Sequence, residues 1–246
     1  MTTLFLFDID GTLLRAMPPA HRQAVCDAAE EVYEVQLEPG DLGTTAGMTD
    51  TAIIVRALRA AGCDGEAISI GLPAFFTAAG AAYERHVPAD LRPYHTPHAE
   101  ATLAWLAERR AALGLVTGNV ERIAWTKLRA AGMADYFAIG GFGDEAEARE
   151  ELPPLALARA QAAFGREFSP DRVYVVGDTP ADVACGAACG LRTVGVATGS
   201  IHSLDQLRAS GADYAFADLG GLRTLELWAD DGERRVEARR DRDQEP

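Results

Sequence analysis

Lysine is almost absent from this sequence. Lys127 is the only one, and the other side chains among the 23 lysines and arginines are all arginine. Positive charge is scarce as a whole, because 37 acidic residues leave the chain with a net charge of -14. Such a chain lacks the basic surface that nucleic acids and anionic membranes require, so we expect neither as a partner. A lone lysine among arginines indicates a need for a compact, flexible point charge, with chance survival as the alternative.

Long apolar runs and cysteines are also scarce. No apolar stretch reaches the length of a membrane span, and no basic region precedes the first apolar run, so we expect a cytoplasmic protein. The four cysteines show no metal-ligand spacing, and we interpret them as small core residues. With 246 residues, 48% of them hydrophobic, the chain is long enough for one large domain or two small ones.

The stretch from Leu4 to Thr12 contains the first chemical signal. Four apolar residues are followed by Asp8, Ile9, Asp10 and Gly11, which predicts a buried strand that ends in two acids and a sharp turn. Buried carboxylates are costly without a partner, and two so close together oppose each other's ionisation. A bound cation removes both difficulties. A surface turn with two solvated acids is the alternative.

Strands and helices alternate from Ala99 to the end, and the predicted strands are continuous apolar runs. This pattern is typical of an α/β protein in which helices cover both faces of a parallel sheet. The segment after the first strand contains predicted helices and no convincing strand, so we interpret it as an insertion. We therefore expect a core of residues 1–14 and 88–229, an inserted helical domain of residues 15–87, and a charged, disordered tail of residues 230–246.

Several element boundaries are also predicted. Residues 65–85 form a helix that Gly71 and Pro73 interrupt, and a short strand covers residues 137–139. Two further helices cover residues 155–164 and 219–228.

Three predicted strands end in polar residues. The first ends in Asp8 and Asp10. The second ends in Thr117, followed by Gly118 and Asn119 at a helix start, and the third leads to Asp178, with Asp182 four residues later. Ligands of such sheets bind at the carboxyl ends of the strands, so these side chains are expected to converge.

Phosphoryl transfer is the chemistry that these residue types favour. An ionised Asp8 can attack phosphorus, and Asp10 can protonate the leaving oxygen and then deprotonate water. Asp178 would hold a hard divalent cation together with Asp8, since Mg²⁺ prefers oxygen ligands. The Thr117 hydroxyl and the amides after it can face an anion at a helix N-terminus. A positive side chain must then neutralise the phosphate.

The chain resembles the haloacid dehalogenase superfamily, in its phosphoglycolate phosphatase-like branch. The resemblance rests on the sequence DIDGT from Asp8, LVTGN around Thr117 and GDTPAD around Asp178, and it covers Thr3 to about Trp228. It implies a Rossmann-like core, an inserted helical cap and Mg²⁺. It also implies that Asp8 is the nucleophile, Asp10 the acid and base and a backbone ligand of the metal, Asp178 a metal ligand, and Asp182 a residue that orients the metal site.

The third motif of the family departs from its usual form. Relatives usually place a lysine just before a helix, often as Lys-Pro, whereas this chain has Ala148-Arg149-Glu150-Glu151 and no lysine there. Arg149 could bind phosphate with two parallel hydrogen bonds, and Lys127 could reach the site because helical side chains lean towards the helix N-terminus. Both remain candidates for phosphate binding, and a solvated surface position is the alternative for each.

The loop from Gly43 to Asp50 resembles the cap loop that reaches over the active site in relatives. On that basis Thr44, Thr45 and Met48 would contact the organic part of a substrate, with a plain helix connection as the alternative. His21 lies 13 residues after Asp8, near the cap histidine of the phosphohexose mutases of this family. We nevertheless interpret His21 as a helix-start residue.

The resulting expectation is a Mg²⁺-dependent phosphatase, a monomer or a homodimer, acting on a small phosphorylated metabolite. Phosphoglycolate and sugar phosphates suit the size of the predicted cap by resemblance. Two alternatives stay open: a phosphomutase of the same superfamily, which forms product isomers instead of free phosphate, and a regulator that binds phosphate or metal without turnover.

Overall fold

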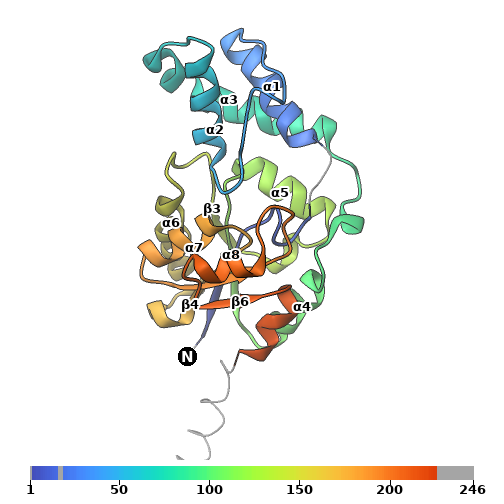
Figure 1. Ribbon diagram of the computed structural model, residues 1–246, viewed down its shortest axis with the longest axis vertical. Coiled ribbons are helices and arrows are strands. Elements are labelled where there is room, and N and C mark those ends of the chain that lie inside the picture. Colours follow the sequence, from blue (N-terminus) through green and yellow to red (C-terminus); the bar gives the residue numbers. More distant parts are fainter. Residues whose placement is uncertain (1, 16–18, 226–246) are drawn as a thin grey trace, which may run out of the picture.

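The computed structural model describes residues 2–15 and 19–225, and its centre is a parallel sheet of six strands (Figure 1). The strand order is β3-β2-β1-β4-β5-β6, which confirms the predicted doubly wound, Rossmann-like α/β fold. The strands are β1 (Leu4–Phe7), β2 (Ala112–Val116), β3 (Ile139–Gly141), β4 (Val173–Gly177), β5 (Arg192–Val196) and β6 (Tyr214–Phe216).

β1 lies in the middle of the sheet, and its sequence explains why. All four of its residues are fully buried, as expected for a strand that is covered on both faces. Leu4 pairs with Ala112 of β2 on one side and with Val173 of β4 on the other. Since all three strands run in the same direction, their carboxyl ends meet at one edge of the sheet.

Eight α-helices occur in the described residues: α1 (Ala20–Tyr33), α2 (Asp50–Ala60), α3 (Gly65–His86), α4 (Ala99–Glu108), α5 (Glu121–Ala130), α6 (Leu152–Phe164), α7 (Pro180–Ala188) and α8 (Leu204–Ala209). Alternate residues of β1 belong to two hydrophobic clusters. Phe5 and Phe7 pack in a cluster with α4 and α5, whereas Leu4 and Leu6 pack in one with α6 and α7. Helices therefore cover both faces of the sheet, as the alternating pattern predicts.

Helices α1, α2 and α3 form a third hydrophobic cluster, and Figure 1 shows them together beyond the carboxyl ends of the central strands. We call residues 20–86 the helical region. We call the rest of the described chain, which forms and covers the sheet, the sheet side. Its buried contribution to this cluster is Val120 and Ile123, at the start of α5. The helical region is thereby held over the end of β2. The domain boundaries after residues 14 and 87 stay predictions, and the tail of residues 230–246 lies outside the described residues.

Helix α3 corrects one sequence prediction, because it continues through Gly71 and Pro73 to His86. A Cβ at Gly71 would lie 2.4 Å from Cε1 of Tyr33, so this glycine permits close packing of α3 on α1. Tertiary packing thus outweighs the low helix propensity of the two residues.

Three other predicted boundaries were wrong. Strand β3 starts at residue 139, two residues later than predicted, and includes Gly140 and Gly141, whose low strand propensity hid it. Helix α6 starts at Leu152 because two prolines fit its first turn. The last predicted helix is a 3-10 segment over Leu219–Thr224, and residues 226–228 lie outside the described part of the chain.

Candidate active site

A cavity of about 270 Å³ lies where the carboxyl ends of β1, β2 and β4 meet the helical region. Its charged and polar wall comes from both parts. The sheet side contributes Asp8, Asp10, Asn119, Arg149, Asp178 and Asp182, and the helical region contributes His21, Arg22, Thr45 and Asp50. The sequence prediction that polar strand ends converge is therefore correct for the three strands concerned.

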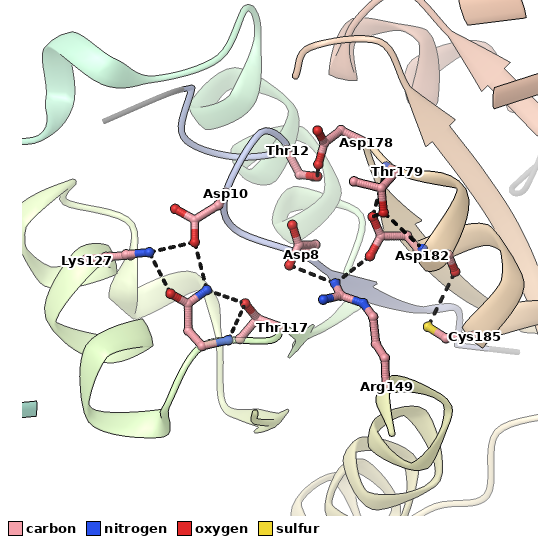
Figure 2. Close-up of polar contacts among 11 residues, drawn as sticks. Asp8, Asp10, Thr12, Thr117, Lys127, Arg149, Asp178, Thr179, Asp182 and Cys185 are labelled. Carbon is pink, nitrogen blue, oxygen red and sulfur yellow. Dashed lines mark hydrogen bonds and ion pairs between the residues drawn. The ribbon is translucent and has the colours of Figure 1, made fainter. Parts of the chain in front are cut away.

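Arg149 lies at the base of this cavity, where it contacts two of the acids. It belongs to a 3-10 turn, Arg149–Glu151, that directly precedes α6. Its Nη2 donates to Oδ1 of Asp8 at 3.0 Å and to Oδ1 of Asp182, as Figure 2 shows. Its Nε is buried and has no partner among the described residues. The guanidinium is thus anchored through one nitrogen and keeps unused donors next to Asp8.

Asp8, Asp178 and Asp182 form a compact acidic cluster. One oxygen of each lies within 4.8 Å of the others, and all three residues are buried. Arg149 contacts Asp8 and Asp182 in the described chain, and its single charge would leave two negative charges uncompensated if all three acids were ionised. Thr12 Oγ1 donates to Oδ1 of Asp178 at 3.3 Å. The charge and the oxygen donors fit a hard divalent cation.

Burial and mutual repulsion raise the pKa values of this cluster. Burial is the main cause for Asp8, to which Asp182 and Asp10 add and which Arg149 opposes, and the pKa reaches about 7. Burial, followed by the charges of Asp8 and Asp182, raises the pKa of Asp178 to about 8. These carboxyls therefore hold protons at a pH where ordinary aspartates are ionised, and a cation in the cluster would favour the ionised forms.

Asp182 is occupied by structural contacts. Its Oδ2 accepts from Thr179 Oγ1 at 2.7 Å and from the backbone N of Thr179 at 3.0 Å. The second of these bonds and the one from Asp182 N to Thr179 Oγ1 form a capping box at the start of α7. Its Oδ1 accepts from Arg149. Because both oxygens are engaged, Asp182 is placed to orient Arg149 and the cluster, while Asp8 and Asp178 retain oxygens for a ligand.

A second group of contacts surrounds Asp10. The Nζ of Lys127 donates to Asp10 Oδ2 and to Asn119 Oδ1, each at 2.5 Å, and lies 3.2 Å from Nδ1 of His21 (Figure 2 draws the first two). An ammonium has three donors and no acceptor, so Nδ1 of His21 accepts and Nε2 carries the hydrogen. That Nε2 lies 2.9 Å from Oδ2 of Asp50 and donates to it. Lys127 is fully buried, with all three donors in use.

The pKa of Asp10 moves in the opposite direction to that of Asp8. Burial opposes ionisation, but the charge of Lys127 and the hydrogen bonds from Lys127 and Asn119 outweigh it and lower the pKa. The side chain of Asp10 keeps 43% of its surface accessible at the cavity. The arrangement therefore presents an ionised carboxylate to a bound molecule.

The segment after β2 contributes unequally to the cavity. Gly118 and Asn119 line it, whereas Thr117 is fully buried and lies behind Asn119, whose Nδ2 donates to Thr117 Oγ1 at 2.6 Å. A Cβ at Gly118 would lie 3.1 Å from Nη1 of Arg149. Gly118 is therefore next to the guanidinium, and a larger residue would crowd it.

The predicted loop reaches the cavity, but not with every residue proposed. Thr45 and Met48 line the wall, whereas Thr44 is exposed and lies outside it. The loop is tied to the sheet side, because the backbone N of Asp50 donates to Gly118 O at 2.7 Å and Thr49 Oγ1 donates to Glu147 O at 2.8 Å.

His21 and Asp50 belong to the cavity although sequence reasoning gave neither a functional role. In the sequence Asp50 was only the last residue of the predicted cap loop. Its Oδ2 also accepts from the backbone N of Val120 at 2.8 Å. The nearby cap histidine of the phosphohexose mutases was the available signal for His21. Nothing in the local sequence indicated that Asp50 would face it.

Comparison with known proteins gives a consistent result. A family model described as haloacid dehalogenase-like hydrolase matches residues 2–190. The phosphoglycolate phosphatase of Neisseria meningitidis is 28% identical over 215 residues, which are 87% of this chain and 88% of that protein. The phosphoglycolate phosphatase of Rhodospirillum rubrum is 29% identical over 236 residues, 90% of each chain.

Solved structures share the fold. A hydrolase from Pseudomonas syringae superposes with a TM-score of 0.63 at 22% identity, covering 92% of this chain and 98% of that one. A β-phosphoglucomutase from Clostridium difficile gives a TM-score of 0.65 at 15% identity, covering 96% and 100%. No helix among the described residues is long and apolar enough to cross a membrane.

Proposed function

Since this chain belongs to the haloacid dehalogenase-like hydrolases, we propose that it is a Mg²⁺-dependent phosphatase that hydrolyses a small phosphomonoester. One observation carries the proposal: Asp8 lies on a cavity wall in a cluster of three buried acids, and Arg149 is beside it. The names of the phosphoglycolate phosphatases that resemble the chain agree with this activity.

Asp8 is the proposed nucleophile. Arg149 holds one of its oxygens, and the other forms a bond to phosphorus while the ester P–O bond breaks. Asp10 gives its proton to the leaving oxygen in this step. A dianionic phosphoryl group beside Asp10 raises its pKa, which opposes the effect of Lys127 and lets Asp10 carry that proton.

Water then hydrolyses the aspartyl phosphate. Asp10 takes a proton from the water, whose oxygen attacks phosphorus and releases phosphate and the Asp8 carboxylate. The lowered pKa of Asp10 suits this second step, because the base must be ionised to accept a proton.

The residues of the acidic cluster fit Mg²⁺. Asp8 and Asp178, with the backbone carbonyl of Asp10, would hold the ion, and Asp182 would orient the cluster. When bound, Mg²⁺ neutralises charge on the phosphoryl oxygens as a Lewis acid. In this proposal Arg149 takes the role of the missing third-motif lysine, and Lys127 keeps the pKa of Asp10 low. Gly118 and Asn119 belong to the loop that borders the phosphate, and Thr117 supports Asn119 through a hydrogen bond.

Phosphoglycolate and sugar phosphates are the first substrates to examine. A phosphomutase is the second candidate, and the observation that favours it is the position of His21 on the cavity wall. The two functions differ in product, since a mutase returns an isomeric sugar phosphate and a phosphatase returns free phosphate.

The test is phosphate release from a panel of phosphomonoesters with and without Mg²⁺. We expect Mg²⁺-dependent release that Asp8→Asn abolishes. The matched control is Asp205→Asn, because the side chain of Asp205 is 91% exposed on α8 and does not line the cavity. Release that survives Asp8→Asn would exclude the aspartyl-phosphate route, and no release from any ester would contradict the phosphatase assignment.

Metal binding gives an independent measurement. Asp178→Asn should weaken Mg²⁺ binding, seen by calorimetry, and lower the Mg²⁺-induced rise in melting temperature. In the metal-free protein at neutral pH the same change should not reduce stability, because burial and the neighbouring acids already raise the pKa of Asp178 to about 8 and keep it protonated. Equal Mg²⁺ affinity in Asp178→Asn and wild type would remove Asp178 from the metal site.

A further inference from the structure

Arg22 is a charged residue on the cavity wall that the proposed chemistry does not use. We propose that Arg22 binds a second anionic group on the organic part of the substrate, so that the preferred substrate is a phosphomonoester with a carboxylate or a second phosphate at its other end. This inference rests on the proposed phosphatase function and specifies the substrate class for the same cavity.

The hydrogen bonds of Arg22 leave one edge of its guanidinium available. Nε and Nη2 both donate to the carbonyl of Pro39, and Nη2 also donates to the carbonyl of Gly43 at 3.1 Å. Neither Pro39 nor Gly43 lines the cavity. Nη1 donates to Thr45 Oγ1 at 3.3 Å, and Thr45 does line it. A guanidinium has five N–H groups, so one hydrogen on Nη1, the nitrogen bound to the cavity-lining Thr45, has no acceptor in the described chain.

The charge of Arg22 is likewise uncompensated. Arg149 is paired with Asp8 and Asp182, and Lys127 with Asp10, whereas Arg22 has no ion pair within residues 2–15 and 19–225. All its partners are carbonyl and hydroxyl oxygens. A partly buried cation without a carboxylate is unfavourable unless a ligand supplies the counter-charge.

The surroundings of Arg22 strengthen its attraction for an anion. Apolar side chains form the neighbouring wall, among them Val25, Leu42, Met48 and Ile53. Such a wall lowers the local dielectric, so a charge-assisted hydrogen bond here is worth more than one in water. Lys127 cannot compete for the same anion because it is fully buried and all its donors are engaged.

Arg56 offers a matched control for a purely structural role. It lies on α2 and binds the same loop, through the carbonyls of Leu42 at 2.5 Å and Thr44 at 2.8 Å. Unlike Arg22, it is exposed and does not line the cavity. If Arg22 only holds the loop in place, removing either arginine should have the same kind of effect.

The experiment compares phosphoglycolate and propane-1,3-diol bisphosphate with 2-hydroxyethyl phosphate, whose tail is neutral and equal in length to that of phosphoglycolate. For wild type with Mg²⁺, kcat/KM should favour at least one of the anionic esters by about ten- to a hundredfold, the range expected for one hydrogen bond to a charged group. Arg22→Met should abolish this ratio, mainly through KM. Arg22→Lys should retain part of it, and Arg56→Met should change all three esters by a common factor.

The outcomes separate the inference from the function on which it rests. A ratio that Arg22→Met leaves intact, or lowers no more than Arg56→Met does, would make Arg22 a loop residue only and overturn the inference while the phosphatase stands. Wild-type preference for the neutral ester would overturn it as well. No hydrolysis of any ester would contradict the phosphatase function itself. Circular dichroism of each variant checks that the fold is retained, and Arg22→Lys keeps the test decisive if Arg22→Met does not fold.

Discussion

Asp8 and Asp10 are one residue apart, yet their surroundings give them opposite properties. Asp8 shares one guanidinium with Asp182 and lies close to Asp178, and its pKa rises to about 7. Asp10 is the carboxyl with which Lys127 forms an ion pair, and the pKa of Asp10 falls below the ordinary value of 3.8. The two carboxyls come from the same strand end, so the difference arises from their partners. One side of the cavity is short of positive charge and suits a cation, and on the other side Lys127 keeps Asp10 ionised for proton transfer.

The two sides also differ in which parts of the chain complete them. The Asp8 side is built from β1, the turn before α6 and the start of α7, all on the sheet. The Asp10 side includes His21 and Asp50 from the helical region. Any displacement of the helical region should therefore disturb proton transfer before it disturbs the cation site.

The largest expected effect comes from Asp10→Asn, which replaces one oxygen and keeps the shape of the side chain. Loss of an acid and base should lower steady-state phosphate release about 100- to 10,000-fold. With p-nitrophenyl phosphate the leaving group needs no proton, so Asp8 should still react. Asp10→Asn should then give a burst of one equivalent of p-nitrophenol and stop, because the aspartyl phosphate is not hydrolysed.

Calorimetric Mg²⁺ binding should be retained in Asp10→Asn, which would separate it from Asp178→Asn. Steady turnover of p-nitrophenyl phosphate at the wild-type rate would show that Asp10 is not the base and that Asp8 and Asp10 do not have the separate roles proposed here. Asp205→Asn, exposed on α8, controls for the loss of a negative charge as such.

A smaller effect is expected from Lys127→Met, which removes the cation of the Asp10 side. The lowered pKa of Asp10 stabilises the folded protein above the unfolded pKa of about 4, and this contribution is lost as the pH falls through the folded value. Without Lys127, burial should instead raise the pKa of Asp10. The fall in the dephosphorylation rate on the acidic side of its pH profile should therefore occur at higher pH. Rates of aspartyl-phosphate hydrolysis between pH 4 and 8 measure this shift. A limb at the same pH in both proteins would mean that Lys127 does not set the ionisation of Asp10.

The sequence was sufficient for the parts of this site that follow from strand ends. Asp8, Asp10, Asn119 and Asp178 line one cavity because parallel strands end at the same edge. It could not decide between Arg149 and Lys127, since a 3-10 turn and a helix each carry one of them to the site. The structure brings both to the site: Arg149 contacts Asp8, and Lys127 contacts Asp10. The sequence analysis treated the two as alternatives and did not anticipate this result.

Contacts between the helical region and the sheet side were beyond prediction for a different reason. They depend on how α1 and α2 pack over β2, which no local pattern encodes. The position of His21 near Lys127 requires that packing, as does the exclusion of Thr44 from the wall. The break predicted at Pro73 failed similarly, because packing of α3 on α1 outweighed propensity.

The smallest change, Gly118→Ala, tests the dependence of the Asp10 side on the helical region. A Cβ at Gly118 would lie 2.1 Å from the carbonyl oxygen of Met48, a backbone atom that cannot rotate away. The loop must therefore move, and Asp50 with it, because the backbone N of Asp50 is bound to Gly118 O. Overpacking of this kind costs about 1–3 kcal/mol, and when this cost falls on the position of the loop against the cavity it raises KM by about five- to 160-fold.

Gly40→Ala is the matched control, because nothing lies within 4 Å of a Cβ at that position and its backbone needs no positive φ. Mg²⁺ affinity should stay at the wild-type value in both variants, since the contacts of Asp8 and Asp178 come from the sheet side, and Nη1 of Arg149, 3.1 Å from the added Cβ, is the end of a flexible side chain that can shift by a few tenths of an ångström. If Gly118→Ala instead weakened Mg²⁺ binding as strongly as it raised KM, the cation side would also depend on the helical region. Asp8 and Asp10 would then differ in their contacts, but cation binding and proton transfer would not be separable functions.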